Sequence, residues 1–411
     1  MVSYPKDWEI RTLGKCGEFI SGVCFPLENQ GEKTGEIPFF KVSDFNSSVN
    51  QFALLKANNY VTRVEAELLS TKFIPKHSIV FAKIGAAIKL ERKRLVMQNS
   101  LIDNNMMAFV TFKDYSIDFL KWFFESVNLS DYIEVTALPS LKSSTLKKIE
   151  VWIPNSKSEQ QAIADALTAF DTHINNLSKL IEKKKMIRDG AVEDLVSGKR
   201  RLAGFSGKWE EISFSKVISE LKSGLSRELR SYDVGLQVIR ANNLDGGKLY
   251  TDSNMKYWYR QDPKGAKTEY YFLRKGDILI NFINSETKMG TAAMVEQELK
   301  RETIYTTNIL RMRIKHEYDP KYIFYITFTE RYKKYIKDIS KVAVNQASFT
   351  TVEYKQFTFN IPTSLTEQQA IADILTAMDK EITDLEEEKE KYIALKAGAM
   401  DDLLTGKIRL A

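Results

Sequence analysis

The sequence predicts an α+β protein in which two similar domains, each a mixed sheet with helices, are separated by two long helices that pair as an antiparallel coiled coil. Three observations predict this fold: a strong internal repeat, a weaker repeat across the rest of each half, and helical spacing of the apolar residues in the strong repeat. The two halves would then be related by an internal pseudo-two-fold symmetry. A chain built from copies has to be analysed copy by copy.

The strong repeat returns 208 positions along the chain, at 366 instead of 158. SEQQAIADALTAFD at 158–171 recurs as TEQQAIADILTAMD at 366–379, and GAVEDLVSGKRRLA at 190–203 recurs as GAMDDLLTGKIRLA at 398–411. Because this period is the size of a domain, solenoids and propellers are excluded. The predicted segments are therefore 1–157, 158–203, 204–365 and 366–411.

A weaker similarity relates the two long segments, 1–157 and 204–365. KDWEIRTLGK at 6–15 aligns with GKWEEISFSK at 207–216, which places Trp8 over Trp209. IEVWIP at 149–154 parallels FTFNIP at 357–362. The two segments share hydrophobic runs but differ in their surface residues, which indicates one scaffold adapted to recognise two different things.

The composition is typical of a globular protein with more than one domain. A length of 411 residues exceeds one ordinary core, and 43% apolar with 28% charged residues excludes a disordered or membranous chain. No apolar run approaches the ~18 residues needed to cross a bilayer, and MVSYPKDWEI does not have the features of a secretory signal. Cys16 and Cys24 are expected to be free thiols in a reducing cytoplasm, although their spacing alone would permit a disulfide.

Positive charge is concentrated in the two divergent segments. Residues 1–157 contain 20 Lys and Arg against 17 Asp and Glu, and residues 204–365 contain 26 against 19. The first copy of the strong repeat has 8 against 7, whereas the second has 6 against 11. A positive surface attracts phosphate backbones, as in nucleic-acid-binding proteins. From charge alone, a solvated basic surface without a partner is an equal alternative.

Apolar residues of the strong repeat recur at alternating spacings of four and three, which is typical of one face of a long helix. This helix-pairing seam consists of Ile163, Leu167, Phe170, Ile174, Leu177 and Ile181 in the first copy and of Ile371, Leu375, Met378, Ile382 and Leu385 in the second. Ser158 and Thr366 are expected to be the N-caps, and Gly198 and Gly406 are expected to end the helices. A helix of about 40 residues is about 60 Å long, and the nearest partner for each stripe is the other copy.

Charges on the two helices favour the pairing of unlike copies. The first helix carries Lys183, Lys184 and Lys185, and the second carries Glu386, Glu387, Glu388 and Glu390. Exposed charges select partners more than they add stability. The alternative is that both runs are solvated faces.

The divergent segments are predicted to form α+β domains with a twisted sheet. SIVFAKIGAAI at 78–88 and GDILINFIN at 276–284 each follow a polar turn, and we expect equivalent strands that run into loops. EIPFFKVSDF at 36–45 corresponds in the same way to GLQVIRANNL at 235–244. LKWFFES at 120–126 and YIFYITFTE at 322–330 are expected to be core helices, and 137–154 and 344–362 close the two domains.

These residues resemble one protein family along essentially the whole chain: the specificity subunits of type I restriction and modification systems. The most specific matches are IPNSKSEQQAIADALTAFD and IPTSLTEQQAIADILTAMD, which are similar to the family's proline, Glu-Gln and Ile-Ala pattern at the start of each shared helix. KGDILI at 275–280 and VNQASF at 344–349 are similar to recurrent features of its recognition domains. The first domain departs from the pattern, with KHSIVF and LPSLKS at the corresponding places.

The resemblance implies sequence-specific recognition of double-stranded DNA without catalysis. Target recognition domains 1–157 and 204–365 would each bind one half of an asymmetric bipartite site. Helices 158–203 and 366–411 would set the spacer and dock two modification subunits, which carry S-adenosylmethionine and methylate adenine N6. A restriction and translocase subunit, which uses ATP and magnesium, would join them in the prokaryotic cytoplasm. The resemblance implies no cofactor on this chain. Independently, two divergent basic units at a fixed separation are suited to read two dissimilar words on one duplex.

The sequence does not contain the common catalytic motifs. GxxxxGK[ST] and a glycine fingerprint are missing, and no two prolines adjoin as in the Asn-Pro-Pro tetrapeptide of amino-methyltransferases. The histidines have no second metal ligand at a suitable spacing: His77, His173 and His316. Asp338 with Glu353 and Lys355 could be fitted to an Asp…Glu-x-Lys nuclease pattern, which a chain with 54 acidic residues can produce by chance.

Base contacts in the major groove need forked donors and amides, presented from loops or helix ends. In the second domain such residues follow three elements that could converge on one groove: Arg240, Asn242 and Asn243; Asn281, Asn284 and Lys288; Asn345, Gln346 and Ser348. The counterparts in the first domain are Lys41 and Ser43; Lys83, Lys89, Arg92, Lys93 and Arg94; Lys142, Ser143 and Ser144. Residues 91–94 are expected to hold phosphates rather than to read bases. For any single asparagine, the alternative is that it only makes a turn.

Three functions compete on these observations. A DNA specificity subunit predicts a bipartite footprint and no methyl transfer without modification subunits. A stand-alone nuclease or methyltransferase predicts activity of the purified chain, and a protein scaffold predicts salt-insensitive partner binding. The duplicated basic domains favour the first hypothesis.

Overall fold

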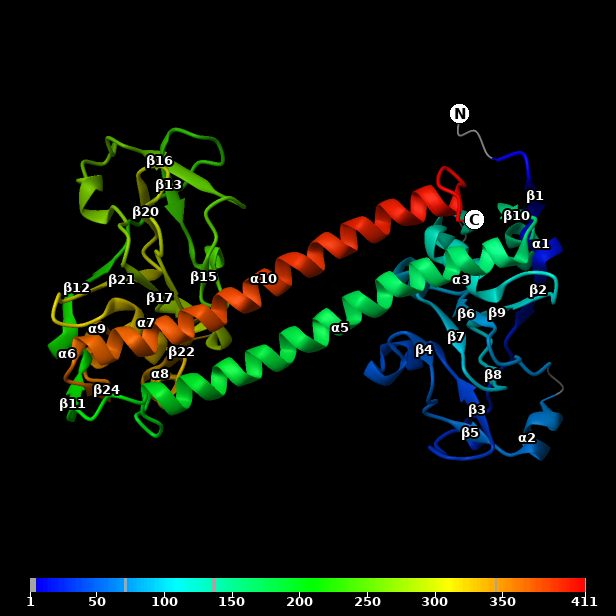
Figure 1. Ribbon diagram of the computed structural model, residues 1–411, viewed down its shortest axis with the longest axis horizontal. Coiled ribbons are helices and arrows are strands. Elements are labelled where there is room, and N and C mark those ends of the chain that lie inside the picture. Colours follow the sequence, from blue (N-terminus) through cyan, green and yellow to red (C-terminus); the bar gives the residue numbers. More distant parts are fainter. Residues whose placement is uncertain (1–4, 70–71, 135–137, 344–345, 411) are drawn as a thin grey trace. The chain divides into compact units, whose positions relative to one another are not determined.

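The computed structural model of the protein describes residues 5–69, 72–134, 138–343 and 346–410 (Figure 1). It forms two compact units, one made of residues 1–177 and 388–411 and the other of residues 178–387. Each unit contains one sheet domain and parts of two long helices, α5 (Lys157–Val196) and α10 (Leu365–Leu404). The predicted α+β fold with two similar domains and two paired helices is confirmed. Within the described residues, no helix is long and apolar enough to cross a bilayer.

The first unit is built on a five-stranded sheet. Its strand order is β2 (Gly17–Ser21), β9 (Met106–Thr111), β6 (Ile79–Ala82), β7 (Lys93–Val96) and β4 (Ala53–Leu54). A three-stranded sheet has the order β5 (Tyr60–Val61), β3 (Ile37–Phe40), β8 (Leu101–Ile102). A two-stranded sheet pairs β1 (Trp8–Thr12) with β10 (Glu150–Pro154). The helices are α1 (Leu13–Cys16), α2 (Arg63–Leu68), α3 (Ile117–Ser126) and α4 (Ser143–Leu146), with short 3-10 turns η1 (Leu27–Asn29), η2 (Val42–Asn46), η3 (Ser48–Asn50), η4 (Ala86–Leu90) and η5 (Leu129–Tyr132).

The second unit has a four-stranded sheet of order β12 (Ile218–Ser223), β21 (Ile309–Ile314), β17 (Ile278–Asn281), β19 (Ala292–Met294). One three-stranded sheet has the order β16 (Lys256–Tyr259), β13 (Gly235–Ile239), β20 (Thr303–Tyr305). Another has the order β18 (Ile283–Asn284), β23 (Gln346–Ser348), β22 (Lys341–Ala343). The strand pairs are β14 (Leu244–Asp245) with β15 (Lys248–Leu249) and β11 (Trp209–Ser213) with β24 (Thr358–Pro362). The helices are α6 (Phe214–Val217), α7 (Pro320–Ile326), α8 (Glu330–Ile339) and α9 (Thr351–Lys355), with 3-10 turns η6 (Ala241–Asn243), η7 (Thr268–Tyr271) and η8 (Glu286–Lys288).

The sheet domains repeat each other closely. In the first unit Trp8 of β1 lies opposite Pro154 of β10, and in the second Trp209 of β11 lies opposite Pro362 of β24. The expected equivalent strands are β6 and β17, whose buried runs are shorter than predicted because a turn follows each of them. The expected core helices are α3 and α7, and their buried faces pack into the two largest apolar cores.

The long helices run antiparallel to each other in both units. In the first unit Lys396 of α10 lies 2.5 Å from Asp171 of α5. In the second unit Arg188 of α5 lies 2.9 Å from Asp379 of α10, which is the same pair with the two copies exchanged. The predicted charge pairing is confirmed for Lys185, which binds Glu386 at 2.7 Å, whereas Lys184 binds Glu381, outside the predicted glutamate run, at 2.5 Å.

The predicted helix-pairing seam divides into two parts. Its first residues, Ile163 and Leu167 in α5 and Ile371 and Leu375 in α10, are buried in the cores of the sheet domains. These cores also contain residues of the partner helix: Leu403 and Leu404 of α10 in the first unit, and Leu195 and Val196 of α5 in the second. Further along the seam, the ring of Phe170 lies 6.4 Å from that of Tyr392 of the partner helix. At the start of each helix one apolar stripe therefore serves both the domain core and the helix pair.

Both helices begin earlier than expected. The hydroxyls that accept a hydrogen bond from the first turn belong to Ser156 and Ser364, and not to Ser158 and Thr366. The expected ends are confirmed, since Gly198 and Gly406 follow the helices with φ of +77° and +69°. These glycines also explain the repeated tryptophans: a Cβ on Gly198 would meet the Trp209 ring at 3.0 Å, and one on Gly406 would meet Trp8 at 3.3 Å.

The repeated Glu-Gln of each helix start ties the helix to its surroundings. Gln160 Nε2 donates to Pro154 O at 2.9 Å, and Gln368 Nε2 donates to Pro362 O at 2.9 Å. The preceding glutamates bind an arginine that follows the end of the other helix. Arg201 binds Glu367 through both carboxylate oxygens at 2.8 and 2.7 Å, and Arg409 binds Glu159 in the same way. We call these two pairs the Glu–Arg clasps; each joins the end of one copy to the start of the other.

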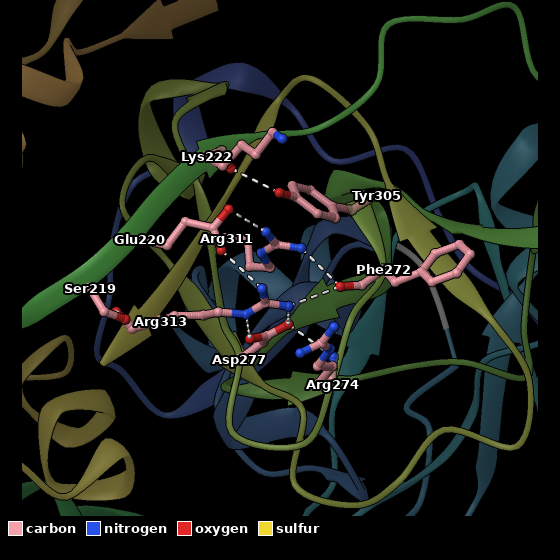
Figure 2. A network of polar contacts seen from close by, with 9 residues as sticks. All are labelled: Ser219, Glu220, Lys222, Phe272, Arg274, Asp277, Tyr305, Arg311 and Arg313. Atoms are coloured by element: carbon pink, nitrogen blue, oxygen red, sulfur yellow. Dashed lines mark hydrogen bonds and ion pairs between the residues drawn. The ribbon is translucent and has the colours of Figure 1, made fainter. Parts of the chain in front are cut away.

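A buried ionic network crosses the four-stranded sheet of the second unit (Figure 2). Arg311 of β21, only 1% exposed, donates to Glu220 of β12 at 2.7 Å and to Phe272 O at 2.8 Å. Arg313 donates to Asp277 at 2.7 Å and to Glu220 at 2.9 Å. The first unit has Ala108 and Val110 at the equivalent ladder positions, opposite Ile20 and Glu18. Apolar packing in one domain is thus replaced by charge pairs in the other.

The two cysteines are free thiols, as expected. Cys16 is buried and Cys24 is exposed. Burial raises the pKa of Cys16 to about 11, which keeps it protonated and unreactive at neutral pH.

Candidate nucleic-acid interface

A cavity of about 600 Å³ opens in the second unit, at the ends of β12, β13, β18 and β20. It is lined by Leu225, Ser226, Arg227, Arg240, Ala241, Asn242, Asn284, Ser285, Lys288, Thr306, Thr307 and Asn308. The lining in the described part of the chain contains two guanidinium groups, one ammonium, three amides and four hydroxyls, and no carboxylate. The cavity therefore presents mainly hydrogen-bond donors, which suits phosphates and base edges.

Direct backbone pairing brings the lining segments together. Leu225 N donates to Tyr305 O at 2.9 Å, and Thr306 N donates to Ile239 O at 2.9 Å. Gly224 lies so close to β20 that a Cβ would be 2.2 Å from Tyr305 O. Any larger residue at this position would push the segments apart.

Four of the predicted base-reading residues reach this cavity: Arg240, Asn242, Asn284 and Lys288. Arg240 follows β13, and its Nη2 donates to Asn254 O while its buried Nε has no partner among the described residues. A buried donor without a partner costs free energy that a bound acceptor would offset. Lys288 Nζ lies 3.4 Å from Asp245, a weak contact that leaves it available.

The third predicted element also lies at this site. β23 pairs with β18, and Ser348 lies opposite Ile283, next to Asn284 of the cavity wall. Gln346 is exposed at the start of β23, and Asn345 lies outside the described residues. The three elements are therefore neighbours in the second domain, and residues of the first two line the cavity.

Two predicted contacts in the second domain are wrong, because their side chains are buried and serve the backbone. Asn243 accepts from Arg240 N at 3.0 Å and donates to Ser253 O at 3.1 Å. Asn281 is fully buried and donates to Thr291 at 2.9 Å. The alternative of a turn-making asparagine therefore holds for Asn243, and Asn281 supports the loop after β17.

Sequence reasoning missed half of the cavity: the segments that contain Arg227 and Thr306. Arg227 is held by Asp262, whose two oxygens lie 3.0 and 2.5 Å from its Nε and Nη2. The same bond raises the pKa of Arg227 and holds that of Asp262 well below its usual range. A signal was present, since Ser-Gly-Val at 21–23 recurs as Ser-Gly-Leu at 223–225.

The first unit brings its corresponding elements together in the same way. Gly22 approaches Asp103 as Gly224 approaches β20, with a Cβ position 1.9 Å from Asp103 O. Asp103 N donates to Phe40 O at 2.9 Å, and Leu141 N donates to Lys83 O at 2.9 Å. Lys83 N also donates to Asn105 O at 2.8 Å, two residues after Asp103, so the loops that begin at 41, 83 and 140 are neighbours.

The charges of this first site are partly buried. Burial lowers the pKa of Lys83, against the opposing effect of Asp103, and burial raises the pKa of Asp103. Lys41 Nζ donates to Gln30 at 2.9 Å, and Lys142 forms an ion pair with Glu134 at 2.6 Å. The other predicted residues of this domain that are exposed or half-buried are Ser43, Lys89, Arg92, Ser143 and Ser144.

The expectation that residues 91–94 hold phosphates is wrong in part. Lys93 is 3% exposed, and its Nζ lies 2.8 Å from both Glu91 and Val127 O. Glu91 in turn accepts a hydrogen bond from Ser130 N at 2.8 Å. The Lys93–Glu91 ion pair therefore stabilises the fold of the domain. Arg94 is half-buried, and burial lowers its pKa.

The residues considered for catalysis or metal binding take part in the fold, through a helix cap, a tight turn and a ring contact. Within the described residues, no three His, Cys, Asp or Glu side chains are grouped to hold a metal ion. Glu353 of the nuclease-like pattern caps α9 by accepting from Thr350 at 2.6 Å. His77 occupies a tight turn with φ of +67°, and the ring of His173 lies 4.1 Å from that of Tyr392.

Comparison with known proteins decides the family. The family described as "Type I restriction modification DNA specificity domain" matches residues 5–185 and 232–395. The chain belongs to this family. Such subunits recognise DNA sequence and are not catalytic, so this chain is a DNA-recognition subunit and not an enzyme.

Individual relatives of this specificity subunit support the assignment. The type I restriction enzyme MjaVIII specificity subunit of Methanocaldococcus jannaschii is 23% identical, over 99% of this chain and 94% of the relative. The HindI specificity subunit of Haemophilus influenzae is 25% identical, over 47% of this chain and 42% of its own length. The crystal structure of a type I S subunit from M. genitalium has a TM-score of 0.59 and 15% identity, over 98% of this chain and 97% of the other. This last likeness shows the shared fold.

Proposed function

We propose that this specificity subunit reads an asymmetric bipartite site on double-stranded DNA, each domain recognising one half. The observation that carries the proposal is the donor-rich cavity of the second unit, together with the equivalent meeting of loops in the first. Because the two sites differ in nearly every polar side chain, they would read dissimilar words.

The paired helices have two proposed roles. They set the spacer between the half-sites, and they dock two modification subunits, which carry S-adenosylmethionine and methylate adenine. A restriction and translocase subunit with ATP and magnesium completes the complex in the prokaryotic cytoplasm. This chain itself supplies recognition and holds no cofactor. The ion pairs between the helices support a rigid pair, which a spacer element needs.

Removing a cavity side chain should weaken recognition of one half-site only. We expect Arg240→Ala or Asn284→Ala to lose about 1–3 kcal/mol of discrimination, since a bidentate base contact is worth that much. The other half-site, read by the first unit, should keep its bases. The measurement is the methylation pattern of variant complexes on a library of sites. Lys275→Ala, at the opposite end of β17, is the control; equal losses in both half-sites would contradict the assignment.

Lengthening both helices should widen the spacer without altering either word. We would insert one heptad after Leu177 and another after Leu385, its equivalent in the second copy, so that the seam stays in register. Two turns add about 10 Å, or about three base pairs of 3.4 Å. Methylation mapping should show unchanged half-sites with a longer gap. A change in the recognised bases at constant spacing would refute the role of the helices.

A further inference from the structure

The second unit carries an element that the described residues of the first unit do not contain. In the first unit α3 is followed by the 3-10 turn η5, and the chain then returns through Ser140 to Lys83. In the second unit α7 is followed by the ten-residue helix α8 and by β22, before the equivalent return at Ser348. The added segment belongs to one half of the molecule and is not needed for the common scaffold.

Helix α8 is anchored against the wall of the cavity. Its buried residues are Tyr332 and Ile336, and Tyr332 Oη donates to Gly290 O at 3.0 Å. Gly290 has φ of +71°, and a Cβ there would meet Ile336 at 2.7 Å. Gly290 closes the loop that contains Lys288, so α8 packs directly behind a cavity-lining residue.

Strand β22 continues the same wall. The sheet order β18, β23, β22 places it two strands from Asn284, or about 10 Å at 4.8 Å per strand. Lys341, Ser348 and Ile283 lie on one rung of this sheet. The added segment therefore extends the recognition surface rather than a remote face.

The exposed side of α8 has more basic than acidic residues: Arg331, Lys333, Lys334 and Lys337 against Glu330 and Asp338. Lys334 and Lys337 are exposed, and no hydrogen bond or ion pair of their side chains occurs within the described residues. Lys341 is the first residue of β22, two residues after the end of α8; its side chain is 70% exposed and lies 3.7 Å from Glu353. We call these three residues the α8 ridge. Of these three residues only Lys334 and Lys337 lie on the helix; they are three residues apart, a spacing at which like charges do not stabilise it. Their ammonium groups are available to bind an anionic ligand.

We propose that the α8 ridge binds phosphates of the duplex next to the bases that enter the cavity. This inference rests on the proposed function and adds to it a sequence-independent grip that only the second half-site has. Lysine serves this purpose as a point charge, and each neutralised phosphate contributes about 0.9 to the salt dependence of the binding constant.

The test is the salt dependence of DNA binding by the full chain. Lys334→Gln/Lys337→Gln/Lys341→Gln should lower the slope of log Kd against log salt by up to about 2.7. The loss of affinity should be equal for a duplex with the methylated site and for one of arbitrary sequence. Lys275→Gln/Lys300→Gln/Lys315→Gln makes the same charge change at the opposite strand ends and should leave the slope unchanged.

The possible results are distinguishable. Equal slopes for both variants would contradict phosphate binding by the ridge. Normal DNA binding with loss of complex assembly would also contradict it and would make the ridge a protein-docking surface. A wild-type chain without any preference for its methylated site would instead refute the proposed function. Thermal unfolding of both variants should match the wild type, because five of the six side chains are exposed and Lys315, which is half-buried, loses only a surface hydrogen bond to Lys216 O.

Discussion

Replacing Glu367 by glutamine is expected to destabilise the second unit by about 3 kcal/mol. Glu367 is fully buried and is bound by both Nη2 and Nε of Arg201, and it also accepts from Trp209 Nε1 at 3.2 Å. The glutamine keeps the shape of the side chain but leaves the guanidinium without its counter-charge. Removing one member of a buried ion pair costs about 3–5 kcal/mol, and the lower value applies here because the Arg201 side chain is 31% exposed and water solvates part of its charge.

Hydrogen exchange of amides in the second unit would measure this loss, because a chain with two units need not unfold in one step. Glu387→Gln, an exposed glutamate on the same helix, makes the same chemical change and should have little effect. Glu159→Gln should destabilise the first unit less, since its partner Arg409 is more exposed than Arg201. If Glu367→Gln behaved like Glu387→Gln, the clasp would not stabilise the unit.

Asp277→Ser is expected to cost about 1–3 kcal/mol, although serine is the residue at the equivalent position of the first unit, because Arg313 keeps only its bond to Glu220 as a charge partner. Asp277 accepts from Arg313 Nε at 2.7 Å and from Arg274 N at 2.9 Å, and it is 2% exposed (Figure 2). In the first domain Ser78 does not have to balance a positive charge, because Val110 occupies the position equivalent to Arg313 of the second domain.

A rescue experiment separates the charge from the shape of the site. Asp277→Ser/Arg313→Val copies the pattern of the first unit and should recover most of the lost stability, because replacing a whole buried pair by apolar groups is often neutral. Urea unfolding of the two variants would show this. If the double variant were less stable than Asp277→Ser alone, the network would not be the cause of the loss.

The sequence predicted the architecture because the repeat is visible without any structure. The copies place Trp8 over Trp209, and both pack against the glycine that ends a long helix. Helix starts were placed two residues late, because Ser158 and Ser156 are both acceptable caps and only the backbone decides between them. The network around Arg311 could not be predicted, since ion pairs across strands depend on register.

For the interface, residue type alone was insufficient. Asn242 and Asn243 are neighbours of the same type, yet the first lines the cavity and the second holds a turn. Comparison of the copies would have separated them, because Asp44 accepts from Lys41 N as Asn243 accepts from Arg240 N. The buried position of Lys93 depends on its contact with Val127, which is distant in sequence.

The most direct test of the account is a map of N6-methyladenine in cells that contain this chain and its matching modification subunits. Two recognition domains of different surface predict methylation at an asymmetric site, two dissimilar words with an unspecified gap of fixed length. Arg240→Ala should relax the base preference at one half-site and leave the other half-site unchanged. A single continuous or palindromic word, or a pattern that does not change with Arg240, would contradict reading by two unlike domains.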